Sequence, residues 1–159
     1  MKHFENLSDQ EYTILKETLT KVAALIANAD GDVDLDETYW AEKITHIRTY
    51  GEPHLLNAYY EDVNADFKKR FEEEVAGLPR DTKEAIDSLS KDIARVNSIL
   101  PKLGPKVSYL MYNGYKTFAK HIAKASGGVL GFFTIDSSEA KLIDLPMITP
   151  IAKPEEDLA

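Results

Sequence analysis

Apolar residues recur three or four positions apart through most of the chain, a spacing that places them on one face of an α-helix. The first such stretch follows Ser8-x-x-Glu11, a capping box in which each side chain satisfies a free backbone amide of the other residue. Its apolar stripe consists of Leu15, Leu19, Val22, Ile26 and Ala29. We therefore predict a first helix that runs from this box to the Asp30-Gly31 pair, where glycine favours a helix end.

The same spacing predicts further helices over residues 34–50, 54–75, 81–100 and 106–125, and a shorter one over 136–145. The helix over 81–100 is expected to begin at the capping box Asp81-x-x-Glu84 and to bury Val96 and Leu100 on its apolar face. No segment combines two-residue alternation with β-branched residues and hairpin turns, so strands are not expected. The prediction is an all-α fold, a single-domain helical bundle of about six helices. We expect this domain to span residues 1–151, with a disordered tail at 152–159.

Charge and composition narrow the classes of function. The chain of 159 residues carries a net charge of −8, which disfavours nucleic acid as a partner. It contains no cysteine, so thiol nucleophiles, disulfides, zinc–thiolate sites and iron–sulfur clusters are excluded. Neither a signal peptide nor a membrane-spanning run is present, so a cytoplasmic location without direct membrane insertion is expected.

Two segments of the chain resemble each other. VAALIANADGDV at residues 22–33 aligns with FAKHIAKASGGV at 118–129, and the aligned positions include Gly31 with Gly127. After an insertion of about six residues in the second segment, Asp34-x-x-Glu37 aligns with Asp136-x-x-Glu139. These matches predict a duplication, in which the first two helices correspond to the last two and the two acidic turns are equivalent.

The acidic stretch NADGDVDLDE at residues 28–37 raises the question of a calcium loop. If Gly31 occupied the sixth position of an EF-hand loop, Ile26 would occupy the first, where an oxygen ligand is required. An EF-hand is therefore excluded. A looser cation site remains open, because water can supply several of the six to eight oxygens that calcium needs.

The candidate ligands for such a cation site are Asp30, Asp34, Glu37, Asp136 and Glu139. A purely structural interpretation stays open beside it. In that interpretation Asp34 and Glu37 cap a helix, and Gly31 ends one.

ALIANADGDVDLDE at residues 24–37 resembles the first signature of the TerB-like family of tellurite-resistance proteins. AKASGGVLGFFTIDSSEAKLI at 123–143 is similar to the later repeat of that family. The resemblance implies a compact helical domain of stress-response operons, with metal-ion binding by acidic residues of the two turns. Asp30 and Glu37 match the first motif and Glu139 matches the second, but Ser126 stands where the second motif has aspartate. The two turns therefore do not offer equal sets of ligands.

Two functional hypotheses follow. The leading one is a non-enzymatic TerB-like stress-response module that binds a divalent cation, a partner protein or both through the acidic turns. The partner protein in this hypothesis can be one associated with the membrane. The alternative is a metal-dependent hydrolase of unknown substrate that uses the same carboxylates. The sequence contains no G-x-S-x-G or H-E-x-x-H motif, so it does not indicate a particular reaction.

Overall fold

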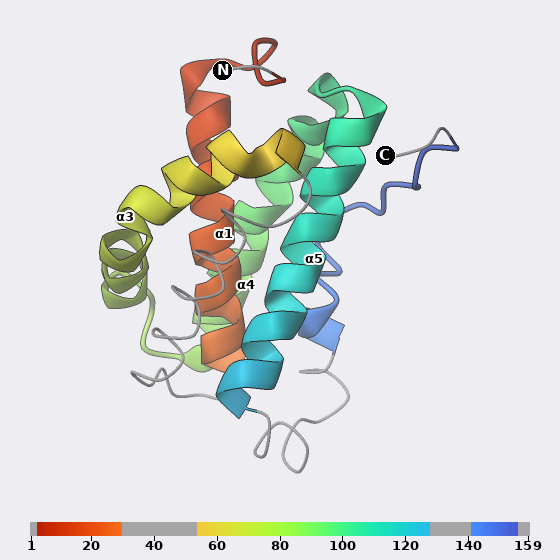
Figure 1. The fold of residues 1–159 in the computed structure, drawn as a ribbon. Helices are drawn as coiled ribbons and strands as arrows, with labels where there is room; N and C mark the ends of the chain where they lie inside the picture. Colours follow the sequence, from red (N-terminus) through yellow and green to blue (C-terminus); the bar gives the residue numbers. More distant parts are fainter. Residues whose placement is uncertain (1–2, 30–53, 128–140, 156–159) are drawn as a thin grey trace.

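The computed structural model describes residues 3–29, 54–127 and 141–155, and within these ranges it contains helices, turns and coil but no strand (Figure 1). The prediction of an all-α fold is confirmed for this part of the chain. The elements are α1 (Asp9–Ala29), η1 (His54–Leu56), α3 (Asn57–Ala76), α4 (Thr82–Ile93), η2 (Ala94–Ser98), η3 (Leu100–Lys102) and α5 (Pro105–Gly127), where η marks a 3₁₀ turn.

Two predicted helices fall largely outside these ranges. The helix expected over 34–50 lies outside the described residues, and of the one expected over 136–145 only 141–145 is described. Residues 141–143 are helical. The duplication stays a prediction, because the second helix of its first copy and most of the second helix of its second copy cannot be compared.

Local capping interactions set the start of two helices, as predicted. The Ser8 amide donates to the Glu11 carboxylate at 2.9 Å, and the Glu11 amide donates to the Ser8 hydroxyl at 3.1 Å. At the start of α4 the Glu84 amide donates to the carboxylate of Asp81 at 3.0 Å. These bonds satisfy amides that have no partner inside the helix.

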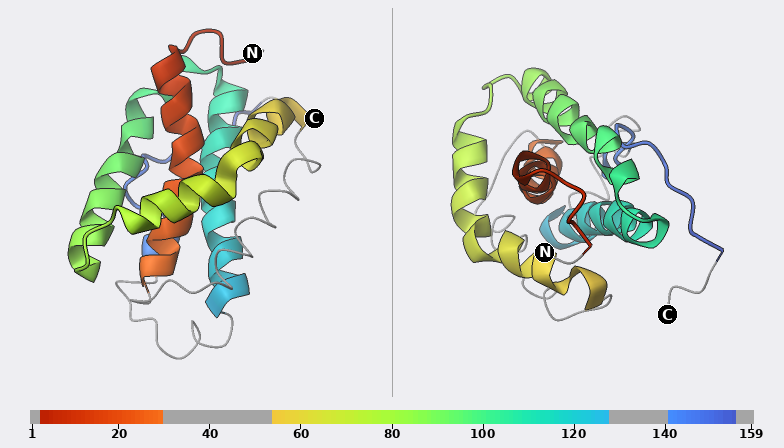
Figure 2. Two further views of the ribbon diagram at one scale, coloured as in Figure 1. Left: turned by 90° about the vertical axis from the view of Figure 1, so that its left-hand side faces the viewer. Right: turned by 90° about the horizontal axis from the view of Figure 1, so that it is seen from above.

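Helix α1 is the centre of the bundle. It packs against α3, α4 and α5, and the view from above in Figure 2 shows these three helices arranged around it. Its buried surface is consequently wider than the predicted stripe and also includes Ala23, Ala24, Leu25 and Ala27. The small alanines allow neighbouring helices to approach α1 from several sides.

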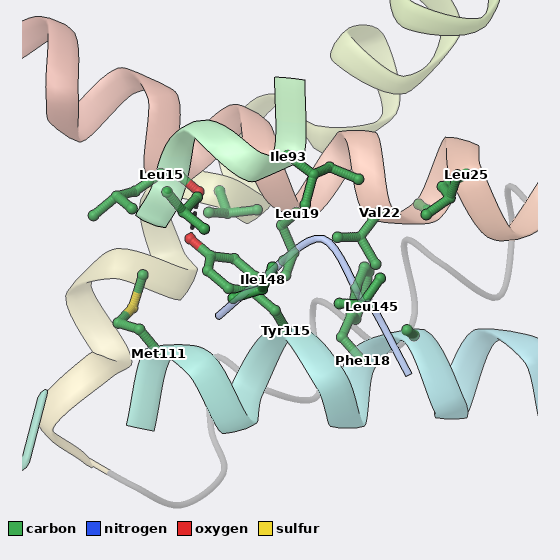
Figure 3. Close-up of a cluster of buried hydrophobic side chains, with 14 of the residues drawn as sticks. Leu15, Leu19, Val22, Leu25, Ile93, Met111, Tyr115, Phe118, Leu145 and Ile148 are labelled. Atoms are coloured by element: carbon green, nitrogen blue, oxygen red, sulfur yellow. Dashed lines mark hydrogen bonds between the residues drawn. The ribbon is translucent and has the colours of Figure 1, made fainter. Parts of the chain in front are cut away.

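The core joins α1 to segments far away in the sequence. Figure 3 shows the side chains of Leu15, Leu19, Val22 and Leu25 from α1 facing residues of α4, α5 and the C-terminal segment. The labelled partners are Ile93, Met111, Tyr115, Phe118, Leu145 and Ile148. All of these residues are buried, so α5 and residues 145–148 complete the core around α1.

Helices α3 and α4 differ from the uninterrupted helices that periodicity predicts. Helix α3 has a kink at Asp66, whose φ of −137° and ψ of 21° are not helical. Helix α4 ends at Ile93, and the rest of the segment predicted as helix to Leu100 forms η2 and the start of η3. Val96 and Leu100 remain buried in this tighter geometry. The apolar spacing thus predicted which residues are buried but not the local helix type.

Helices α1 and α5 run in the same direction. Both views from the side show their carboxyl ends at the same end of the bundle (Figures 1 and 2). The chain segments that carry the two acidic turns therefore leave the described bundle from one end.

Candidate functional site

The five predicted ligands, Asp30, Asp34, Glu37, Asp136 and Glu139, all lie outside the described residues. The structure describes the helices that lead into them. Helix α1 ends at Ala29, one residue before Asp30, and α5 ends at Gly127. The predicted helix end at Asp30-Gly31 lies outside the described residues and stays a prediction.

The carboxyl ends of α1 and α5 contribute partial negative charge to this end of the bundle, because the peptide dipoles of a helix add along its axis. The last turn of α1 contains no basic residue that would offset this charge. One of its carbonyl groups has a side-chain partner, since the Asn28 amide donates to Ala24 O at 2.9 Å. Electrostatically, this end of α1 favours a cation over an anion.

Within the described ranges, no group of three or more histidine, aspartate or glutamate side chains is arranged to hold a metal ion. The carboxylates of 30–37 and 136–139 are the acidic groups nearest in sequence to the carboxyl ends of α1 and α5.

A second polar feature, which periodicity did not predict, is a cleft of about 490 Å³ between α1 and α3. We call it the α1–α3 cleft. Its lining consists of Glu17, Thr20 and Lys21 from α1 and Asp66, Lys69, Arg70, Glu73 and Glu74 from α3. The kink in α3 lies at one of these lining residues, Asp66.

Ion pairs cross this cleft. The Lys21 ammonium lies 2.9 Å from Glu74 and 3.3 Å from Asp92, so it ties α1 to both α3 and α4. Burial alone would lower the pKa of Lys21, but the two carboxylates outweigh it and raise that pKa. Arg70 donates from Nε to Asp66 at 2.7 Å and from Nη1 to Glu17 at 3.5 Å.

A buried tyrosine cluster lies elsewhere in the core. The hydroxyl groups of Tyr59 and Tyr115 both donate to the carbonyl oxygen of Leu15, at 2.7 and 2.9 Å, and lie 3.2 Å apart. Burial raises the pKa of each phenol, because the phenolate would lose its hydration. Both groups therefore stay neutral at physiological pH and act as hydrogen-bond donors that lock α3 and α5 onto α1.

The sequence carried only a weak signal for the α1–α3 cleft. Thr20 and Lys21 are polar residues in a helix that is otherwise buried on several sides. The partners of Lys21, however, lie 53 and 71 residues away in the chain. Helical periodicity describes neighbours three or four residues apart, so it could not identify these partners.

The described residues contain no helix long and apolar enough to span a membrane. Comparison of the chain with protein-family models, with curated proteins and with solved structures found no match.

Proposed function

We propose that the chain is a cytoplasmic, non-enzymatic TerB-like stress-response module of the tellurite-resistance type. In this proposal the acidic turns bind a divalent cation, a basic partner protein or both. The ligands are the carboxylates of Asp30, Asp34, Glu37, Asp136 and Glu139. Carboxylate oxygens are the donors that hard cations such as Ca²⁺ and Mg²⁺ prefer.

The observation that supports this proposal most is the parallel arrangement of α1 and α5. Because both helices end at the same end of the bundle, the segments beginning at residues 30 and 128 start from one region of the molecule. Two sets of carboxylates separated by about a hundred residues in sequence can then act on one ligand. The partial negative charge at the two helix ends adds to the attraction of a cation.

Titration calorimetry with Ca²⁺, Mg²⁺, Mn²⁺ and Zn²⁺ tests the cation site. We expect the wild-type chain to bind at least one of these ions below millimolar concentration. Removing two charged ligands in Asp30→Asn with Glu37→Gln should weaken that binding by at least about tenfold. The matched control is Glu72→Gln with Asp87→Asn, which removes the same charge from exposed positions of α3 and α4.

Absence of binding to the wild type below millimolar concentration would overturn the cation site and leave a basic partner protein as the ligand of the acidic turns. Equal weakening in the control variant would show that the ions respond only to net charge. Metal-dependent turnover of a generic phosphoester, lost in the Asp30→Asn and Glu37→Gln variant, would favour a hydrolase over a binding module.

A further inference from the structure

The α1–α3 cleft has the size and the chemistry of a ligand site that is separate from the acidic turns. Its volume of about 490 Å³ falls within the range usual for small-molecule sites. Its lining is dominated by charged side chains rather than apolar ones, which points to a polar, charged ligand.

The balance of charge in the α1–α3 cleft favours a cationic ligand. Four carboxylates and three basic groups line it, and Asp92 adds a further carboxylate next to Lys21. Each of the two partly buried basic groups, Lys21 and Arg70, already lies near two carboxylates. Their positive charge is thus neutralised. With Lys69 as the third basic group, the five carboxylates still exceed the basic groups by two, so an added anion would meet net repulsion.

Two carboxylates on opposite walls have the most acceptor capacity left. The Glu17 side chain on α1 is 43% exposed, and its contact with Arg70 is 3.5 Å, the longest in the cleft. Glu73 on α3 is exposed, and no ion pair to it occurs among the described residues. A ligand with positive groups at both ends would therefore bridge the two helices.

Thr20 supplies an independent indication of a ligand. It lines the cleft on α1, is only 2% exposed, and its hydroxyl has no hydrogen-bond partner among the described residues. Buried hydroxyl groups normally have a partner, because leaving one unpaired is unfavourable. One turn of helix separates Thr20 from Glu17, so both side chains lie on the same face of α1.

An organic ammonium ion satisfies this set of groups better than a metal ion does. An ammonium group donates three hydrogen bonds, which matches separate carboxylate and hydroxyl acceptors. The described residues provide no group of acidic or histidine side chains arranged for metal binding, the α1–α3 cleft included. The methylene chain of a diamine can lie along the aliphatic stems of Lys69 and Arg70.

We propose that the α1–α3 cleft binds a linear di- or polyammonium ion, the polyamine class, with one ammonium on Glu17 and Thr20 and another on Glu73. Binding there joins α1 to α3 across the cleft. It does not involve the acidic turns at residues 30–37 and 136–139.

Calorimetric titration of the full chain with spermidine, a linear triamine, tests this site at physiological ionic strength, where diffuse attraction to the net charge is screened. We expect saturable binding of one spermidine per chain. Glu17→Gln with Glu73→Gln should weaken it by about tenfold. The control Glu72→Gln with Asp87→Asn, which makes the same change in net charge, should retain the wild-type affinity.

Thr20→Val separates a binding role from a structural one. Replacing an unpaired buried hydroxyl by a methyl group should raise the melting temperature, and it should weaken spermidine binding several-fold. Unchanged affinity in this variant would remove Thr20 from the site and overturn the proposed geometry.

Three other results would overturn the proposal. They are the absence of saturable binding, an equal loss of affinity in the two paired variants, and a loss confined to Asp30→Asn with Glu37→Gln. The last result would assign spermidine to the acidic turns. We expect the variant Asp30→Asn with Glu37→Gln to retain spermidine binding. That result would support a spermidine site that is independent of the cation site.

Discussion

Gly114 leaves the space that the hydroxyl of Tyr60 occupies where α5 passes α3. A Cβ atom built on Gly114 would lie 2.6 Å from that hydroxyl oxygen, which is closer than nonbonded atoms approach. Tyr60 is 3% exposed and its ring packs edge-on against Tyr59, with the ring centroids 5.1 Å apart. The tyrosine therefore has little freedom to move away.

Gly114→Ala should accordingly destabilise the protein, although alanine is the better helix former. Overpacking a core typically costs about 1–3 kcal/mol, against a gain of about 1 kcal/mol in helix propensity. We expect a net loss of about 1–2 kcal/mol in the free energy of unfolding, measured with urea. Adding Tyr60→Phe, which removes the clashing oxygen, should recover part of the loss.

Gly77→Ala is the matched control at the end of α3. Its backbone φ of −87° suits any residue, and the added Cβ would make only ordinary contacts of 3.5 Å or more. We expect the free energy of unfolding to increase by about 0.4–1 kcal/mol, because alanine gives the unfolded chain less conformational entropy than glycine. If Gly114→Ala raised stability in the same way, the close approach to Tyr60 would not constrain α5.

Among the elements, the C-terminal segment is held to η2 by two hydrogen bonds of one side chain, Asn97. Asn97 in η2 donates to Met147 O at 2.8 Å and accepts from the Thr149 amide at 2.8 Å. These two bonds hold the backbone on either side of Ile148, whose side chain is buried. Asn97 thereby fixes the segment that follows residues 128–140 in the sequence.

Removing this anchor in Asn97→Ala should lower the free energy of unfolding by about 1–2 kcal/mol, because two hydrogen bonds are lost and Met147 O is left to water. Hydrogen exchange should show faster exchange at the Thr149 amide. Ser98→Ala is the neighbouring control, since the Ser98 hydroxyl donates to Arg95 O within the same turn. Equal effects of the two substitutions would argue against a specific role for Asn97.

For the molecule as a whole, the buried tyrosine cluster couples stability to alkaline pH. Tyr59 and Tyr115 have raised pKa values in the folded state, so they keep their protons when the unfolded chain loses its own. Their contribution to stability is complete below a pH of about 10, the unfolded value, and decreases as the pH rises above it. Lys21, whose pKa is also raised, acts in the same direction.

We therefore expect the free energy of unfolding to decrease above pH 10 by about 1.4 kcal/mol per pH unit for each of the two tyrosines. Urea unfolding at a series of pH values measures this slope. Tyr115→Phe should make the slope shallower by the share of one tyrosine, about 1.4 kcal/mol per pH unit, while Leu15 O retains its bond from Tyr59. An unaltered slope in Tyr115→Phe would contradict the role of the cluster.

The sequence predicted those features of the fold that depend on neighbours within one helical turn. The helical class of the described residues, the capping box at Ser8 and the cap at Asp81 follow from contacts between residues three or four positions apart. Such contacts join residues that are close in sequence, so the sequence alone is enough to predict them. The five carboxylates of the proposed cation site stay a prediction of this kind, because the structure does not describe them.

Tertiary packing decided the rest. Helix α1 is buried on several sides because three helices surround it, and its own apolar stripe does not contain that information. The kink at Asp66, the two carboxylates around Lys21 and the unpaired hydroxyl of Thr20 also depend on where distant segments cross. Periodicity along one helix determines which residues avoid water, but the positions of partners more than fifty residues away are set only when the helices pack together.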